Sequence, residues 1–300
     1  MPTVTPSGAI LGARITGIDL AAPMAREDFA LILRALATHG VVCFPDQQLD
    51  PAAHAAFSRQ FGTLEVHVSG AFQVPEHSEV MILSNMVENG RPIGLADAGQ
   101  DWHTDMSFSR TIAFVSVLHA LQVPRRNGRA LGDTLFADMA AAFDDLPPGL
   151  QTRLESLTAT HDFAKFWDMM RARGGAGSVR KPLTEAQRAQ KPPVSQPMVR
   201  RHPLSGRRIL YANPGYTVRI DGVAAAESDA LLETLFAHQL EQCYQYAHHW
   251  TEGDVLMWDN IRTMHYAVPD YGPGEHRLVR RCQAMADRVF EPEFRDFLAF

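Results

Sequence analysis

The amino-acid sequence predicts a mainly β fold in which two sheets pack face to face and helices flank them, as in a jelly roll. Three observations support this: many short strand-like segments, few helix-like segments, and no alternation of strands with helices of the kind that builds a parallel sheet. The 300 residues fit one domain, because double-sheet β folds often exceed about two hundred residues. We therefore expect a single domain over residues 1–300.

The composition argues against several classes of protein. A net charge of −6 and a pI near 6.1 disfavour a nucleic-acid binder, whose surface would be basic. No apolar run is long enough to span a membrane, and the N-terminus lacks the basic and apolar regions of a signal peptide. The three cysteines are far apart and form no disulfide framework. We expect a cytoplasmic homo-oligomer, a dimer or tetramer, without nucleic-acid or membrane partners.

The first elements are predicted from the spacing of apolar residues and from the glycine and proline residues that interrupt or end each run. Residues 9–20 predict a pair of short strands interrupted by glycine. Apolar residues at helical spacing predict a helix over 26–39, which Gly40 would end. Residues 41–44 form an apolar run typical of a buried strand. A second helix is predicted over 51–61, because it starts with proline and glycine follows it.

The rest of the chain repeats this pattern of short strands and outer helices. We predict strands at residues 80–84, 113–121, 131–136, 208–212, 255–258 and 277–285, and helices at residues 137–146, 149–157 and 224–238. Two segments, 67–100 and 163–197, are rich in Gly and Pro and lack clear periodicity. Long segments of this kind are usually functional, so we expect mobile active-site loops there.

A candidate metal site begins at His103 and Asp105, which are two residues apart. In an extended strand such residues project from the same face, so an imidazole and a carboxylate would converge. Two histidines and one carboxylate form the ligand set of non-haem Fe(II) oxygenases, and His265 is the candidate third ligand. Zinc is a competing metal, because it accepts the same donors. Each histidine, taken alone, is more often an ordinary strand-end residue bonded to backbone.

Arg277 and Arg281 are four residues apart and share a face in either a strand or a helix. A guanidinium binds a carboxylate with two parallel hydrogen bonds, which suits a dicarboxylate co-substrate. The alternative is a solvated basic face that includes His276 and Arg280, and the residue alternation does not decide which arginines point inward. Thr134 could add a hydroxyl donor, or could be an ordinary β-branched strand residue.

At this point the sequence resembles the taurine/2,4-dichlorophenoxyacetate dioxygenases, which use Fe(II), 2-oxoglutarate and O2. The resemblance covers nearly the whole chain. It rests on Gly12–Leu20, Phe57–Gly62, Trp102–Asp105, Gly132–Thr134, His202–Arg207 and Trp258–Asn260, followed by His265 and the paired arginines.

The resemblance implies a distorted jelly roll, that is, a cupin-like double-stranded β-helix. It also implies roles for individual residues: His103, Asp105 and His265 as iron ligands, Arg277 and Thr134 on the distal carboxylate of 2-oxoglutarate, and Arg281, His67 and Phe163 facing the primary substrate. The implied reaction converts 2-oxoglutarate to succinate and CO2 and hydroxylates a second substrate.

We expect the substrate to be a small organic acid, such as a sulfonate, a sulfate ester or an aryloxyalkanoate. Arg281 would bind its anionic group, while aromatic residues of the second long segment would cover an apolar body. Alternatively, Arg281 pairs with Asp259, Asp270 or Glu275 and only ties strands together. A second hypothesis is a non-catalytic cupin-like sensor that holds a metal or a small acid.

Overall fold

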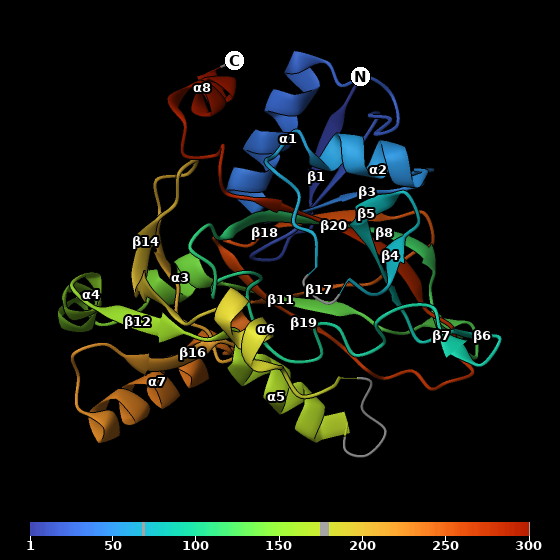
Figure 1. The fold of residues 1–300 in the computed structure, drawn as a ribbon. Helices are drawn as coiled ribbons and strands as arrows, with labels where there is room; N and C mark the ends of the chain where they lie inside the picture. The colour runs from blue at the N-terminus through green and yellow to red at the C-terminus, as the bar shows by residue number, and fades with distance from the viewer. Residues whose placement is uncertain (68–69, 175–179, 300) are drawn as a thin grey trace.

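The computed structural model describes residues 1–67, 70–174 and 180–299, and it confirms the predicted mainly β fold (Figure 1). The larger sheet has the strand order β1-β2-β3-β18-β8-β20-β5-β4 and is antiparallel except between β2 and β3. Its strands are β1 (Thr3–Pro6), β2 (Ala13–Thr16), β3 (Val41–Phe44), β18 (Val255–Asp259), β8 (Ala113–Gln122), β20 (Leu278–Met285), β5 (His77–Ser84) and β4 (Gln73–Val74).

A smaller sheet, β17-β11-β19, packs on one face of the larger sheet, and helices α1 and α2 cover the opposite face (Figure 1). Its strands are β17 (Gln245–His248), β11 (Thr134–Asp138) and β19 (Thr263–Ala267). Further short strands form a three-stranded sheet and three hairpins: β13 (Val194–Pro197), β12 (Thr158–His161) and β16 (Thr217–Ile220); β6 (Val87–Glu88) with β7 (Arg91–Pro92); β9 (Arg125–Arg126) with β10 (Arg129–Ala130); and β14 (Val199–Arg201) with β15 (Arg208–Leu210).

The helices flank these sheets. They are α1 (Arg26–His39), α2 (Pro51–Ser58), α3 (Met139–Asp144), α4 (Pro148–Glu155), α5 (Phe163–Gly174), α6 (Glu185–Gln190), α7 (Ala225–Gln239) and α8 (Pro292–Arg295), with short 3-10 turns η2 (Gln242–Tyr244) and η3 (Asp296–Ala299). In the described part of the chain, no helix combines the length and the apolar character needed to cross a bilayer.

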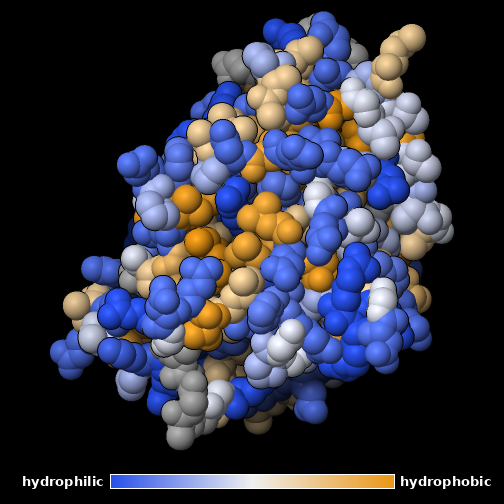
Figure 2. Space-filling view, turned by 90° about the vertical axis from the view of Figure 1, so that its right-hand side faces the viewer, coloured by the Kyte–Doolittle hydropathy of each residue, from blue (hydrophilic) through white to orange (hydrophobic). Residues whose placement is uncertain are grey.

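On the face shown in Figure 2, apolar side chains gather near the centre and polar ones surround them.

Residue alternation along β3 separates two of the apolar cores of the protein. Val42 and Phe44 face the core beneath α1 and α2, while Val41 and Cys43 face the core between the two sheets. Successive strand residues point to opposite faces, so one short strand serves both cores. The core between the sheets also contains Phe136 of β11, and the functional site lies at its open end.

Most predicted elements are present, with informative differences. The α1 and β3 bounds match the prediction, and Gly40 ends α1 with a φ of 68°, a left-handed conformation that glycine adopts without strain. The first strand pair is Thr3–Pro6 with Ala13–Thr16 rather than a pair within 9–20. Because β1 is a mostly exposed edge strand, its residues carry no apolar alternation to reveal it.

The segment 163–197 is more ordered in secondary structure than the sequence indicated. It contains α5, α6 and β13, although residues 175–179 lie outside the described part. Phe163, Phe166 and Met170 have helical spacing and are buried. They pack with Phe108 and Tyr216, so α5 is held by an aromatic cluster that forms only in the folded protein.

Candidate functional site

A β-bridge brings the two candidate histidines together. His103 forms an isolated antiparallel bridge with His265 of β19, and backbone hydrogen bonds of 3.2 and 2.8 Å join them. Asp105 follows in a turn rather than in the extended strand that the sequence predicted. Its carboxylate still reaches both imidazoles: Oδ1 lies 3.4 Å from His103 Nε2, and Oδ2 lies 3.9 Å from His265 Nε2. One donor atom from each of the three buried residues lies within 4.8 Å of the others.

Hydrogen bonds orient this cluster. His103 Nδ1 donates to the backbone carbonyl of Asp101 at 2.7 Å, because a carbonyl only accepts, and this leaves His103 Nε2 as the nitrogen that faces Asp105. The Ser116 hydroxyl donates to Asp105 Oδ2 at 2.7 Å. Two side-chain amides donate to that hydroxyl in turn, those of Asn260 at 3.0 Å and Gln283 at 3.2 Å.

The electrostatics of the cluster favour a bound cation. Burial raises the pKa of Asp105, but the two imidazoles and Arg281 outweigh burial and hold that pKa below its usual range. Burial, together with His103, lowers the pKa of His265 to about 3. At neutral pH the cluster therefore presents a carboxylate and neutral imidazole nitrogen, the forms that bind metals.

The donor set fits a divalent metal ion. His103 Nε2 and His265 Nε2 both face the Asp105 carboxylate, and His265 Nδ1 is buried without a hydrogen-bond partner in the described part of the chain. His265 is therefore not the backbone-bonded histidine of the alternative interpretation. Two imidazoles and one carboxylate match the facial set of non-haem iron, although zinc accepts the same donors.

An inner chamber, defined by Thr134, His265, Arg277 and their neighbours, adjoins the cluster. Thr134 and Arg277 are both buried at its wall. The Thr134 hydroxyl accepts from Trp250 Nε1 at 3.0 Å, which leaves its own proton available to donate. The backbone N–H of Arg277, the residue before β20, donates a hydrogen bond to Asn85 Oδ1 at 2.9 Å. This bond fixes the start of the strand. The inner chamber thus combines a guanidinium and a hydroxyl beside the cluster.

The structure resolves which arginines point inward. Arg277 and Arg281 both line the inner chamber, whereas Arg280 lies on the opposite face of β20 and donates to the carbonyl of Leu49 at 3.2 Å. A solvated basic face is therefore the wrong interpretation of Arg277 and Arg281. The spacing of four residues predicted this shared face correctly.

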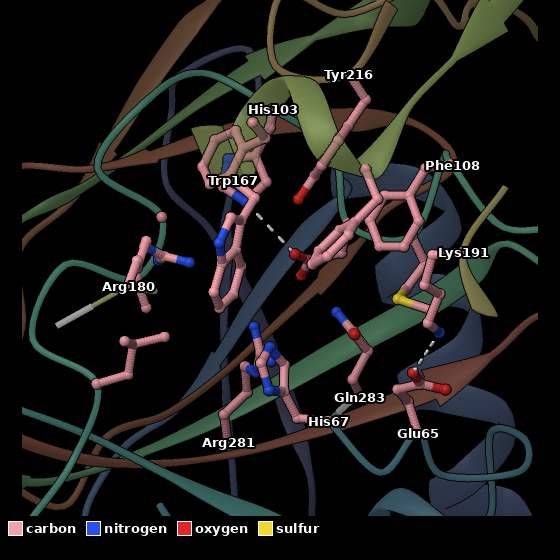
Figure 3. A pocket seen from close by; sticks show the side chains of 17 residues that line it. Glu65, His67, His103, Phe108, Trp167, Arg180, Lys191, Tyr216, Arg281 and Gln283 are labelled. Carbon is pink, nitrogen blue, oxygen red and sulfur yellow. Dashed lines mark hydrogen bonds and ion pairs between the residues drawn. The ribbon is translucent and has the colours of Figure 1, made fainter. Parts of the chain in front are cut away.

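An outer chamber meets the inner one at His103 and Arg281 (Figure 3). Its polar wall contains His67, Arg180, Lys191 and Gln283, and its apolar wall contains Phe108, Phe163, Phe166, Trp167 and Tyr216. Burial lowers the pKa of His67 to about 3, and the cationic Arg281, Arg180 and Lys191 contribute to that shift. His67 is therefore neutral at physiological pH.

Arg281 has no carboxylate partner among the described residues. Its Nη2 lies 3.5 Å from the sulfur of Met81. The three carboxylates proposed as alternative partners are bonded elsewhere: Asp259 to His202 at 2.6 Å, Asp270 to the backbone of Gly132 at 2.7 Å, and Glu275 to Arg126 at 2.6 Å. Arg281 therefore does not tie strands together through any of these carboxylates.

Several residues of the outer chamber were not predicted from the sequence. Arg180 makes two hydrogen bonds to Asp97, at 2.8 and 3.0 Å, and its guanidinium lies 4.8 Å from the ring centre of Trp167. Lys191 pairs with Glu65 at 3.1 Å. The Arg180–Asp97 pair links the two long segments across the site, and the Lys191–Glu65 pair links the second segment to a residue just before the first. The sequence offered one signal for these contacts, which is that all the residues that make them lie in or next to the two long segments.

Comparison with known proteins identifies the family. The family model for the taurine catabolism dioxygenase TauD, TfdA family matches residues 3–283. The chain is 33% identical over 293 residues to pentalenolactone F synthase of Streptomyces avermitilis, covering 95% of this chain and 94% of that protein. It is also 33% identical over 295 residues to the alpha-ketoglutarate-dependent 2,4-dichlorophenoxyacetate dioxygenase of Cupriavidus pinatubonensis, covering 95% and 98%.

A solved structure supports the same assignment. The crystal structure of a taurine dioxygenase from Burkholderia xenovorans superposes with a TM-score of 0.76 at 28% identity, covering 95% of this chain and 90% of that one. Enzymes of this family use Fe(II) with 2-oxoglutarate and O2. The hypothesis of a non-catalytic sensor is therefore set aside. The chain belongs to the TauD/TfdA family and is a 2-oxoglutarate-dependent non-haem iron dioxygenase.

Proposed function

We propose that His103, Asp105 and His265 hold the iron and that the enzyme hydroxylates a small organic acid with an apolar or aromatic portion. When bound, the iron supplies the oxidative decarboxylation of 2-oxoglutarate and the hydroxylation of the substrate. A metal held by only these three residues would have room to bind the co-substrate and oxygen. Ser116 and the carbonyl of Asp101 keep the ligands in their binding orientation.

Arg277 and Thr134 bind the distal carboxylate of 2-oxoglutarate in this proposal. Both are buried in the inner chamber beside His265, and no carboxylate of the described residues forms an ion pair with Arg277. A buried guanidinium without an anionic partner is costly, and a dicarboxylate would supply that partner. The Thr134 proton adds a hydrogen bond to the same carboxylate.

The observation that carries the substrate class is Arg281. It lies where the two chambers meet, lacks a carboxylate partner in the described part of the chain, and is close enough to lower the pKa of Asp105. An anionic group on Arg281 would therefore lie near the metal, with hydroxylation at a neighbouring carbon. The neutral His67 can add a hydrogen bond, and Phe163 with Trp167 can cover the apolar body.

Arg281→Ala and Arg281→Lys test this proposal. We expect both variants to raise KM for the best carboxylate, sulfonate or sulfate found by screening. The increase should be smaller for lysine, because an ammonium keeps the charge but cannot make the two parallel hydrogen bonds of a guanidinium. The measurement is substrate-stimulated succinate formation, with Arg280→Ala as a control on the outer face of β20. Normal KM in both Arg281 variants, or equal turnover of a neutral analogue, would refute the anionic substrate.

The mobility of segments 67–100 and 163–197 remains a prediction. The Arg180–Asp97 ion pair joins these segments, and the Lys191–Glu65 pair joins the second segment to a residue just before the first. Glu65, Arg180 and Lys191 line the outer chamber. We expect amide hydrogen exchange in both segments to slow when 2-oxoglutarate and substrate bind together. Strong and unchanged protection before and after binding would show that the segments do not act as a cover.

A further inference from the structure

A second buried cluster of metal-binding side chains lies outside the site described above. Cys43, His248 and Asp254 each contribute one donor atom, and these atoms lie within 4.8 Å of one another. All three residues are buried, with exposed fractions of 6%, 6% and 2%. We propose that this cluster is a second metal site, which takes a borderline-soft divalent ion of the zinc type.

The three residues come from different parts of the fold. Cys43 lies on β3 of the larger sheet, His248 ends β17 of the smaller sheet, and Asp254 directly precedes β18. Cys43 belongs to the core between the two sheets. An ion held by this cluster would therefore join the two sheets to each other and to the turn that connects them.

Two polar atoms in the cluster have no hydrogen-bond partner within the described residues, His248 Nε2 and Asp254 Oδ1. Leaving such buried atoms unpaired destabilises the folded protein, and a metal ion between them would coordinate both residues. The other oxygen of Asp254 is already oriented, because it accepts from the backbone of Thr251 at 2.9 Å. The cluster thus combines a fixed carboxylate with an unpaired imidazole nitrogen.

The spacing agrees with tetrahedral coordination. His248 Nε2 lies 3.3 Å, without hydrogen-bond geometry, from Asp254 Oδ2, the oxygen that also accepts from Thr251. Two ligands at the usual zinc distances of about 2.0–2.1 Å are separated by roughly 3.3 Å in a tetrahedron. A thiolate ligand sits slightly farther from the ion, at about 2.3 Å. Three protein donors would leave the fourth position for a water molecule.

Charged and polar groups surround the cluster. The Asp254 carboxylate and Arg14 of β2 both lie beside the Cys43 thiol, and Tyr246 of β17 lies close to the same thiol and carboxylate. The thiolate is the form of cysteine that binds a metal, so binding of a divalent ion would release the thiol proton to solvent. The ion would neutralise the resulting thiolate and the carboxylate.

This cluster differs from the proposed iron site in its chemistry. It offers sulfur, nitrogen and oxygen, whereas His103, Asp105 and His265 offer only nitrogen and oxygen. A thiolate favours softer ions than a site without sulfur does. The rings of His248 and Trp250 pack edge-to-face, with 4.8 Å between their centres. Trp250 also donates a hydrogen bond to the Thr134 hydroxyl, so it lies between the second site and the inner chamber.

Cobalt(II) titration of the metal-free full-length protein tests the proposal, because a thiolate ligand gives an intense charge-transfer absorption that nitrogen and oxygen ligands do not give. We expect cobalt to produce this absorption in the wild type, and one equivalent to produce it in a His103→Ala/Asp105→Ala double variant, which lacks the proposed iron site. Cys43→Ser should abolish it. Asp254→Asn, which keeps the thiol, should weaken cobalt binding at this site by about tenfold or more.

The other cysteines provide matched controls. Cys243 is exposed and Cys282 is buried elsewhere, so Cys243→Ser and Cys282→Ser should leave the absorption unchanged. Circular dichroism and thermal unfolding verify that each variant is folded. Absence of the absorption in folded wild-type protein would overturn the proposal. Its persistence in Cys43→Ser, or unchanged binding in Asp254→Asn if Cys43→Ser does not fold, would do so as well.

Discussion

Replacing His103 or Asp105 with alanine is expected to abolish Fe(II)-dependent turnover of 2-oxoglutarate while the protein stays folded. Each substitution removes one of three metal donors, and the two that remain cannot hold the ion in a defined geometry. The fold should survive, because the bridge between His103 and His265 is made by backbone atoms. Succinate formation with added Fe(II) and ascorbate measures the loss, and circular dichroism verifies the fold.

A surface histidine provides the control for this experiment. His249 has an exposed side chain, pairs with Asp133 at 2.7 Å and is not one of the three residues of the cluster. His249→Ala should therefore keep wild-type turnover. Appreciable activity in either His103→Ala or Asp105→Ala would remove these residues from the ligand set.

Arg277→Ala is expected to raise KM for 2-oxoglutarate by roughly a hundredfold. Loss of a buried, charge-assisted pair typically costs a few kcal/mol, which corresponds to a change of about this size. Arg277→Lys should fall between the wild type and the alanine variant, because an ammonium keeps the charge without the two parallel hydrogen bonds. Initial rates of succinate formation over a range of 2-oxoglutarate concentrations give the constants.

The neighbouring arginines separate the roles. Arg280→Ala should leave KM for 2-oxoglutarate unchanged, because that side chain lies on the opposite face of β20. If Arg277→Ala has normal co-substrate kinetics and Arg281→Ala has a raised KM for 2-oxoglutarate, then Arg281 binds the co-substrate. The proposed division between the inner and outer chambers would then be wrong.

Local spacing was enough to predict part of the site. His103 and Asp105 converge as predicted, but through an isolated bridge followed by a turn rather than through the extended strand from which the prediction was made. Arg277 and Arg281 share a face because four residues return a strand to the same side. In the same way, α1 was predicted with its correct bounds, since its apolar spacing ends at a glycine.

The rest of the site depends on contacts between distant segments. Ser116 reaches Asp105 only after β8 has taken its place in the larger sheet, and Arg180 meets Asp97 across the outer chamber. Contacts of this kind leave no periodic pattern of apolar residues in the local sequence, so the sequence alone does not reveal them. Short strands such as β19, which carries His265, were also missed, because five residues in a small sheet are too few to show an alternation.

The most direct test of the proposed site is a crystal structure of the enzyme with metal and 2-oxoglutarate, grown without oxygen, with the metal located by its anomalous scattering. The proposal predicts one metal bound by His103, Asp105 and His265, and the distal carboxylate of 2-oxoglutarate on Arg277 and Thr134. A metal that is not bound by those three residues, or a distal carboxylate that does not contact Arg277, would contradict it.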